Sequence, residues 1–94
     1  MTDPRTLALP AVLDLNAAAP LREQLLALRG GPAILDGSAV ERLGALCLQV
    51  LLAARRTWAA DGAELRLTGA SEALSAQLAA FGAPDLELPA GGAA

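Results

Sequence analysis

Apolar residues recur along the chain with two periods, one typical of strands and one typical of helices. Three segments space their apolar residues every three to four positions, which predicts helices over residues 17–29, 43–60 and 71–81. Short apolar runs lie between them and predict strands over residues 6–9, 32–36, 63–68 and 85–88, with residues 11–15 extending the first strand after a bend at Pro10. The chain therefore alternates strands and helices.

The residues at the ends of the predicted helices are of types that typically begin or end a helix. Asn16 is a plausible N-cap for the first helix, and Gly30-Gly31 end it. Asp61-Gly62 stop the second helix. Ser71 is expected to cap the third helix, with Glu72 in its first turn, where a carboxylate suits the helix dipole.

The second predicted helix has two apolar faces. The face expected to pack on the sheet carries Leu43, Cys47, Val50, Leu51, Ala54 and Trp58. The outer face then carries Leu46, Gln49, Leu52 and Ala53. An exposed apolar stripe of this kind is a candidate protein-binding surface, and the alternative is a helix that is simply apolar all round.

This alternation predicts an α/β fold. We expect one small domain over residues 1–94, with residues 1–5 and 90–94 frayed, built on a four-stranded, mainly parallel sheet covered by three helices. Sites in such sheets favour the carboxyl ends of the strands. That rim comprises residues 14–16, 36–46 and 69–72.

Composition removes most catalytic chemistry. The chain has no His, a single Cys and no Lys, so it lacks a histidine base, an imidazole or thiolate metal cluster, an internal disulfide and a Schiff-base lysine. We expect no enzymatic activity, no metal and no cofactor. Asp14 and Asp36 are expected to serve as caps or turn residues rather than as paired catalytic carboxylates, and Cys47 as a small buried apolar residue rather than a nucleophile.

Charge and hydropathy limit the partners. A net charge of −3 argues against nucleic acid, which needs a basic face. No uncharged run is longer than residues 43–54, and that run is short of the roughly 20 residues that span a bilayer. The N-terminus has no basic stretch leading into an apolar run. We therefore expect a cytoplasmic protein without direct membrane insertion.

Three segments in order resemble the STAS domain family, the anti-sigma-factor antagonists. They are Leu-Asp-Leu then Leu-Arg-Glu-x-Leu within residues 13–25, Ile-Leu-Asp then Val within residues 34–40, and Gly-Ala-Glu-Leu-Arg-Leu, then Ser71, Leu78 and Phe81-Gly82, within residues 62–82. The spacing agrees without gaps from Leu13 to Gly82. The resemblance implies a small α/β sheet covered by helices, with the two usual N-terminal strands trimmed to residues 6–15.

The chain departs from the family at its switch. The resemblance implies an Asp-Ser-Ser-Gly motif at the start of the second helix, where phosphate on a serine ends partner binding. Here the four positions are Gly44, Ala45, Leu46 and Cys47, and Leu46 stands where the phosphorylated residue would be. That switch is absent. Ser38 is the only hydroxyl in the preceding loop, and it is either a turn residue or a relocated phosphorylation site.

The resemblance implies a non-catalytic regulatory module that binds a protein partner, here constitutively. The partner is expected to be a signalling kinase, an anti-sigma factor or a chemotaxis component, since residues 40–51 also resemble small STAS proteins encoded with alphaproteobacterial chemotaxis genes. Glu41 and Arg42 either pair with partner charges or form a solvated loop pair. The expected contact residues are Ser38, Glu41, Arg42, Ala45, Leu46 and Gln49.

An alternative is a STAS subunit of an ABC-type lipid transport system that docks on its ATPase. That group often keeps a Thr in the switch motif, which this chain lacks.

Overall fold

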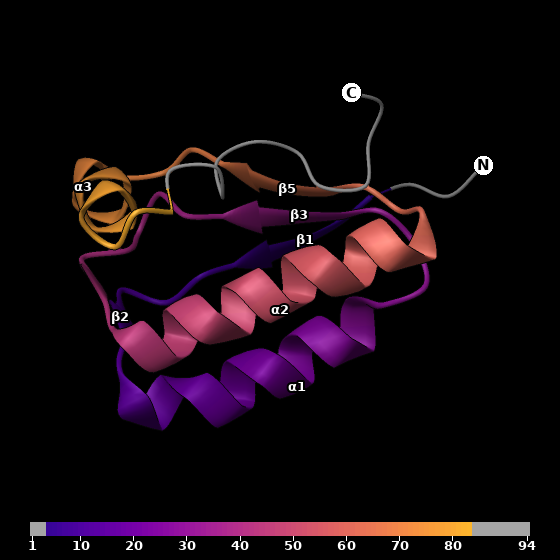
Figure 1. Cartoon of the computed structure of the whole chain (residues 1–94), viewed down its shortest axis with the longest axis horizontal. Coiled ribbons are helices and arrows are strands. Elements are labelled where there is room, and N and C mark those ends of the chain that lie inside the picture. Colours follow the sequence, from indigo (N-terminus) through magenta and orange to yellow (C-terminus); the bar gives the residue numbers. More distant parts are fainter. Residues whose placement is uncertain (1–3, 84–94) are drawn as a thin grey trace.

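The computed structural model describes residues 4–83 and contains a three-stranded parallel sheet (Figure 1). The strands are β1 (Arg5–Ala8), β3 (Ala33–Asp36) and β5 (Leu65–Thr68), in the order β1-β3-β5. Arg5 pairs with Ala33, and Ala33 pairs with Leu65. The α/β class and the parallel sheet are confirmed. The fourth predicted strand, at residues 85–88, lies outside the described residues.

A second, two-stranded sheet corrects the prediction of one four-stranded sheet. It pairs β2 (Val12–Leu13) with β4 (Arg42–Leu43), also in parallel. Pro10 separates β1 from β2 because it has no N–H for a continuous ladder. The sequence prediction missed β4, since two residues are too few to show a strand period, and it placed residue 43 in a helix instead.

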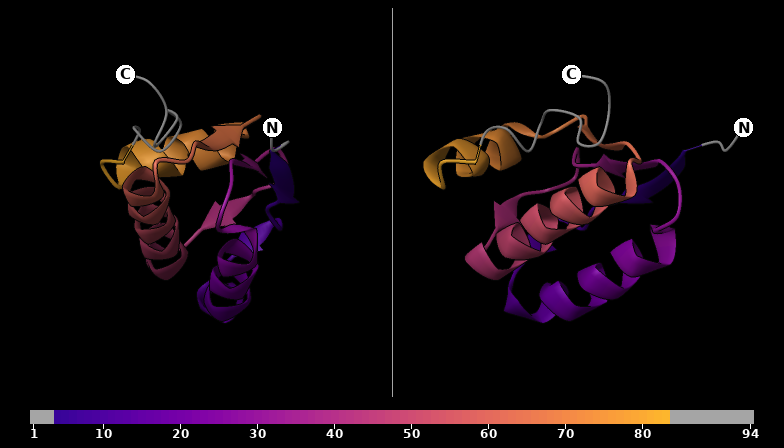
Figure 2. Two further views of the ribbon diagram at one scale, coloured as in Figure 1. Left: turned by 90° about the vertical axis from the view of Figure 1, so that its right-hand side faces the viewer. Right: turned by 45° about the vertical axis from the view of Figure 1, so that its right-hand side comes forward.

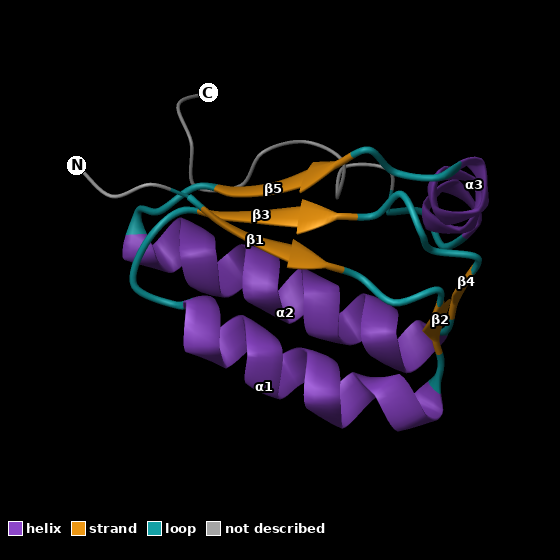
Figure 3. Cartoon of the chain, turned by 180° about the vertical axis from the view of Figure 1, so that it is seen from behind, coloured by secondary structure: helices purple, strands orange, loops and turns teal. Residues whose placement is uncertain are grey.

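Three helices complete the fold: α1 (Ala18–Leu28), α2 (Ala45–Asp61) and α3 (Glu72–Ala80). Each lies within two residues of its predicted bounds. The helices α1 and α2 lie side by side on one face of the main sheet (Figure 2). Figure 3 shows the three strands running toward the end of the molecule where β2, β4 and α3 lie. That end therefore collects the carboxyl ends of the strands.

The predicted N-caps of the helices are confirmed in part. Ser71 caps α3 as predicted, and its side chain accepts a hydrogen bond from the N–H of Leu74. Asn16 is not a cap. A short 3₁₀ turn (η1, Leu15–Ala17) precedes α1, and the side chain of Asp14 accepts hydrogen bonds from the N–H groups of Asn16 and Ala17. Asp14 thus has the capping role expected for it.

The core lies between the sheet and helices α1 and α2 and extends to α3, whose Leu74 and Leu78 are fully buried. Cys47, Leu51, Ala54 and Trp58 are buried as predicted. Val50 is only half-buried, and Leu48 is buried in its place. The buried face of α2 is therefore rotated by part of a turn from the predicted one. Fully burying one leucine side chain stabilises a fold by about 1.5–3 kcal/mol.

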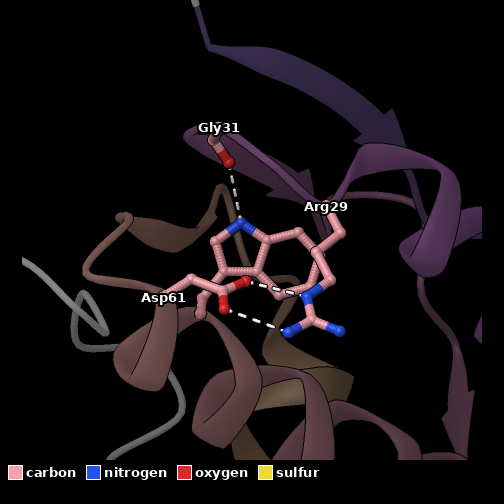
Figure 4. Close-up of polar contacts among 4 residues, drawn as sticks. Arg29, Gly31 and Asp61 are labelled. Carbon is pink, nitrogen blue, oxygen red and sulfur yellow. Dashed lines mark hydrogen bonds and ion pairs between the residues drawn. The ribbon is translucent and has the colours of Figure 1, made fainter.

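Two polar contacts hold α1 and α2 together at the end opposite α3 (Figure 4). The guanidinium of Arg29 donates two hydrogen bonds to the carboxylate of Asp61, at 2.8 and 3.0 Å. The indole nitrogen of Trp58 donates to the carbonyl of Gly31 at 2.9 Å. Gly62 then ends α2 in the left-handed conformation, with φ of 69°, as the predicted stop requires.

Between residues 4 and 83, no helix is both long enough and apolar enough to cross a membrane.

Candidate functional site

All six residues predicted to contact a partner are exposed. The loop between β3 and β4 contains Ser38 and Glu41, and β4 contains Arg42. The first turns of α2 contain Ala45, Leu46 and Gln49. We call these six residues the partner rim. The partner rim follows the carboxyl end of β3 directly, which is where the fold class places its sites.

The partner rim begins with a turn fixed by Asp36. Its carboxylate accepts a hydrogen bond from the N–H of Ser38 at 3.0 Å. Hydrogen bonds from Ser38, first from its N–H and then from its side chain, lower the pKa of Asp36 below its ordinary value. Asp36 therefore has the turn role that the sequence predicted. The Ser38 side chain itself is at the surface.

The backbone of Glu41 and Arg42 is hydrogen-bonded to the residue that precedes β2. Their N–H groups both donate to the carbonyl of Ala11, at 2.7 and 3.1 Å. Their side chains are exposed, and neither makes an ion pair with any residue in the described range 4–83. A fixed backbone thus presents one acidic and one basic side chain to solvent.

Helix α3 fastens the same segment through two side chains that sequence analysis did not single out for this role. The amide of Gln77 accepts a hydrogen bond from the N–H of Leu43 and donates one to the carbonyl of Glu41 at 3.4 Å. The hydroxyl of Ser71 donates to the carbonyl of Val40. Gln77 is the one amide in a helix otherwise rich in Ala and Leu, and that isolation was its only signal in the sequence.

The start of α2 carries the four positions, Gly44 to Cys47, that the sequence resemblance predicted to stand in place of a switch motif. Gly44 is the N-cap and has no side chain to fill that role. A Cβ at this position would lie 3.3 Å from the carbonyl oxygen of Leu13, a close contact. Ala45 and Leu46 face solvent, and the exposed fraction of Leu46 is 44%. The first turn of α2 therefore presents a large apolar side chain to solvent.

Cys47 points the other way, into the core. Its thiol is fully buried and donates to the carbonyl of Asp14 at 3.2 Å. Burial, and then the negative charge of Asp14, raise the pKa of Cys47. A buried thiol with a raised pKa is a poor nucleophile, which agrees with the role predicted for it.

The predicted outer stripe of α2 borders a groove. Leu46, Gln49 and Ala53 are exposed as expected, whereas Leu52 is half-buried. A groove of about 380 Å³ runs between this face and α1. The α1 wall was not predictable from the sequence, because nothing in the apolar spacing of α1 shows that α2 lies beside it. We call this the α1–α2 groove; its lining residues are Arg22, Leu25, Leu26, Leu46, Gln49, Val50, Ala53, Ala54, Thr57 and Trp58.

The described part of the chain contains no cluster of residues typical of a metal site. No three His, Cys, Asp or Glu residues between 4 and 83 lie close enough together to hold a metal ion.

Comparison with known proteins gives one result. A family model described as "Mlab, STAS domain" matches residues 2–88. The searches of curated proteins and of solved structures returned no match.

Proposed function

Because the chain belongs to the STAS domain family, we propose that it is a non-catalytic regulatory module that binds a protein partner through the partner rim. The partner is a signalling kinase, an anti-sigma factor or a chemotaxis component, and the complex forms in the cytoplasm. The observation that carries the proposal is Leu46, an exposed leucine on the first turn of α2, beside a loop whose backbone is held on both sides.

Binding of this kind is constitutive. A phosphate in the first turn of α2 would add about two negative charges to the contact, but neither Ala45 nor Leu46 has an oxygen to accept one. Control then lies with the state of the partner or with the concentration of the protein. Incubation with a serine kinase should leave residues 44–47 unmodified. Phosphate on exposed Ser38 that weakens binding would contradict the constitutive part of the proposal.

The proposal is tested by Leu46→Asp, assayed by affinity capture from the native cell with the full chain as bait. The second position of a helix favours an acidic side chain, and the first turn of α2 has none, so folding stability should not fall. Partner capture should fall about tenfold or more, because a charge at the contact loses its water without a counter-ion.

Ala19→Asp is the matched control, since Ala19 is exposed and is also the second residue of its helix, α1. It should fold and capture partners like the wild type. A folded Leu46→Asp protein that captures the same partners equally well would exclude the partner rim as the contact.

A second candidate is the subunit of an ABC-type lipid transport system that docks on its ATPase. An apolar first turn without an acceptor hydroxyl suits a permanently bound subunit as well as a constitutive regulator. The same capture experiment separates the two, because a transport ATPase or a signalling protein is recovered with wild-type bait and lost with Leu46→Asp.

A further inference from the structure

The α1–α2 groove is an apolar surface with one unusual member, the cation Arg22. Its floor includes the buried side chains of Leu25 and Trp58, and two exposed leucines flank it, Leu26 on α1 at 50% exposure and Leu46 on α2 at 44%. Leu26 and Leu46 are joined by the apolar lining of the groove into one continuous surface, and a continuous apolar surface is typical of a protein-interaction site.

The α2 wall of the groove follows one continuous helical stripe. Its residues recur at intervals of three and four from Leu46 to Trp58, twelve steps along the helix. At 1.5 Å per residue the stripe is about 18 Å long. The α1 wall is shorter and runs from Arg22 to Leu26. The α2 stripe matches about three turns of a third helix, which packs its own ridge of apolar side chains into such a groove.

Charge adds a second requirement for the occupant. Arg22 is the single charged side chain among the described residues that line the groove. It makes no ion pair or hydrogen bond with any residue between 4 and 83, whereas Arg29, which directly follows α1, is paired with Asp61. The chain as a whole carries a net charge of −3, so a lone cation beside an apolar groove is complementary to an acidic side chain of the occupant.

The groove is continuous with the partner rim, because Leu46 and Gln49 belong to both. We propose that the α1–α2 groove binds an amphipathic α-helix of the protein partner, about three turns long, with an apolar face in the groove and an Asp or Glu that pairs with Arg22. This inference rests on the proposed function in that the occupant is a segment of the same partner.

Site-specific photocrosslinking in the native cell tests the groove directly. A photoreactive phenylalanine derivative is placed at position 26 in the groove, at position 46 shared by groove and rim, and at Thr6 on the opposite face of the sheet as a control. Mass spectrometry then locates the crosslinked residues. Adducts from positions 26 and 46 should map to one helical segment of one partner, with none from position 6.

Adducts from position 46 without adducts from position 26 would overturn the groove inference and leave the partner rim intact. Absence of adducts from both positions would contradict the proposed function as well. Adducts to a second copy of this chain, to lipid, or to a non-helical segment would each replace the helix with a different occupant.

Charge reversal tests the role of Arg22 in the complex so identified. Arg22 is exposed, so Arg22→Glu should fold normally, and it should weaken binding of the partner about tenfold, whereas Arg22→Met should have a smaller effect. Changing the acidic residue of the crosslinked helix to Arg should restore binding to Arg22→Glu. Equal binding by Arg22→Glu and wild type would overturn the acidic pairing.

Discussion

Leu46 and Cys47 are adjacent in the chain and lie in opposite environments. The first is 44% exposed and the second is fully buried, because successive residues of a helix point about 100° apart. The sequence predicted both placements from the spacing of apolar residues along α2. It wrongly placed Val50 rather than Leu48 in the core, since both are apolar and only a small rotation of the helix decides which of them is buried.

Cys47 should be slow to react with thiol reagents in the folded protein. Its pKa is raised by burial, so at a given pH the reactive thiolate is scarcer than in an ordinary cysteine, and reagent reaches it only when the fold opens. Alkylation by iodoacetamide at pH 8 should be about a hundredfold slower or more in buffer than in denaturing urea. Equal rates in the two solvents would mean that the first turn of α2 opens readily.

Gln77 is the residue whose role sequence analysis could not anticipate. Its side chain bonds to the backbone of Glu41 and Leu43, more than thirty positions away. Nothing local to α3 reveals such a contact, because it exists only once α3 packs against β4. By contrast, the cap that Ser71 forms with Leu74 and the turn that Asp36 forms with Ser38 each span at most three residues, and both were predictable from the sequence.

At the scale of elements, α3 and β4 depend on each other through this amide. Gln77→Ala should lower the free energy of unfolding by about 1–3 kcal/mol, because the N–H of buried Leu43 loses its acceptor. Gln77→Glu keeps an acceptor and should lose less. Urea unfolding followed by circular dichroism measures both.

Gln24→Ala, at an exposed position of α1, is the control and should be neutral or slightly stabilising. An unchanged midpoint for Gln77→Ala would show that α3 holds the loop through packing alone.

The helices were predictable to within two residues because each is long enough to repeat its apolar spacing two or more times. The pair β2 and β4 was not, since each strand is two residues long and pairs with a strand about thirty positions away. That missing pair also explains the misplaced start of α2. Arg42 and Leu43 are extended, so the helix begins at Ala45 rather than at residue 43.

For the whole molecule, two carboxylates make stability depend on pH. The hydrogen bond from Arg29 is the larger cause of the lowered pKa of Asp61, and those from Ser38 lower that of Asp36. A carboxylate with a lower pKa in the folded state contributes stability above its unfolded pKa, about 3.9, and loses it as pH falls through the folded value. The protein should therefore become easier to unfold below about pH 4.

Asp61→Asn isolates one of these contributions. At pH 7 the variant should have a lower urea midpoint than the wild type, because Arg29 has lost its ion pair. The difference should shrink as the pH falls below the ordinary aspartate value, where the wild-type carboxylate is protonated as well. A difference that stays constant from pH 7 to pH 2.5 would mean that the charge of Asp61 is not what joins α1 to α2.

The order β1-β3-β5 also has a consequence for how the chain reaches its fold. Each strand of the main sheet pairs with one that is about thirty residues away, with a helix in between, so no hairpin can form first and guide the rest. During synthesis, β1 has no partner until β3 has left the ribosome, and the three-stranded sheet is complete only after β5. Folding should therefore be slower than in a helical bundle of equal length, in the millisecond range or longer, with α1 and α2 gaining helical structure before the sheet closes.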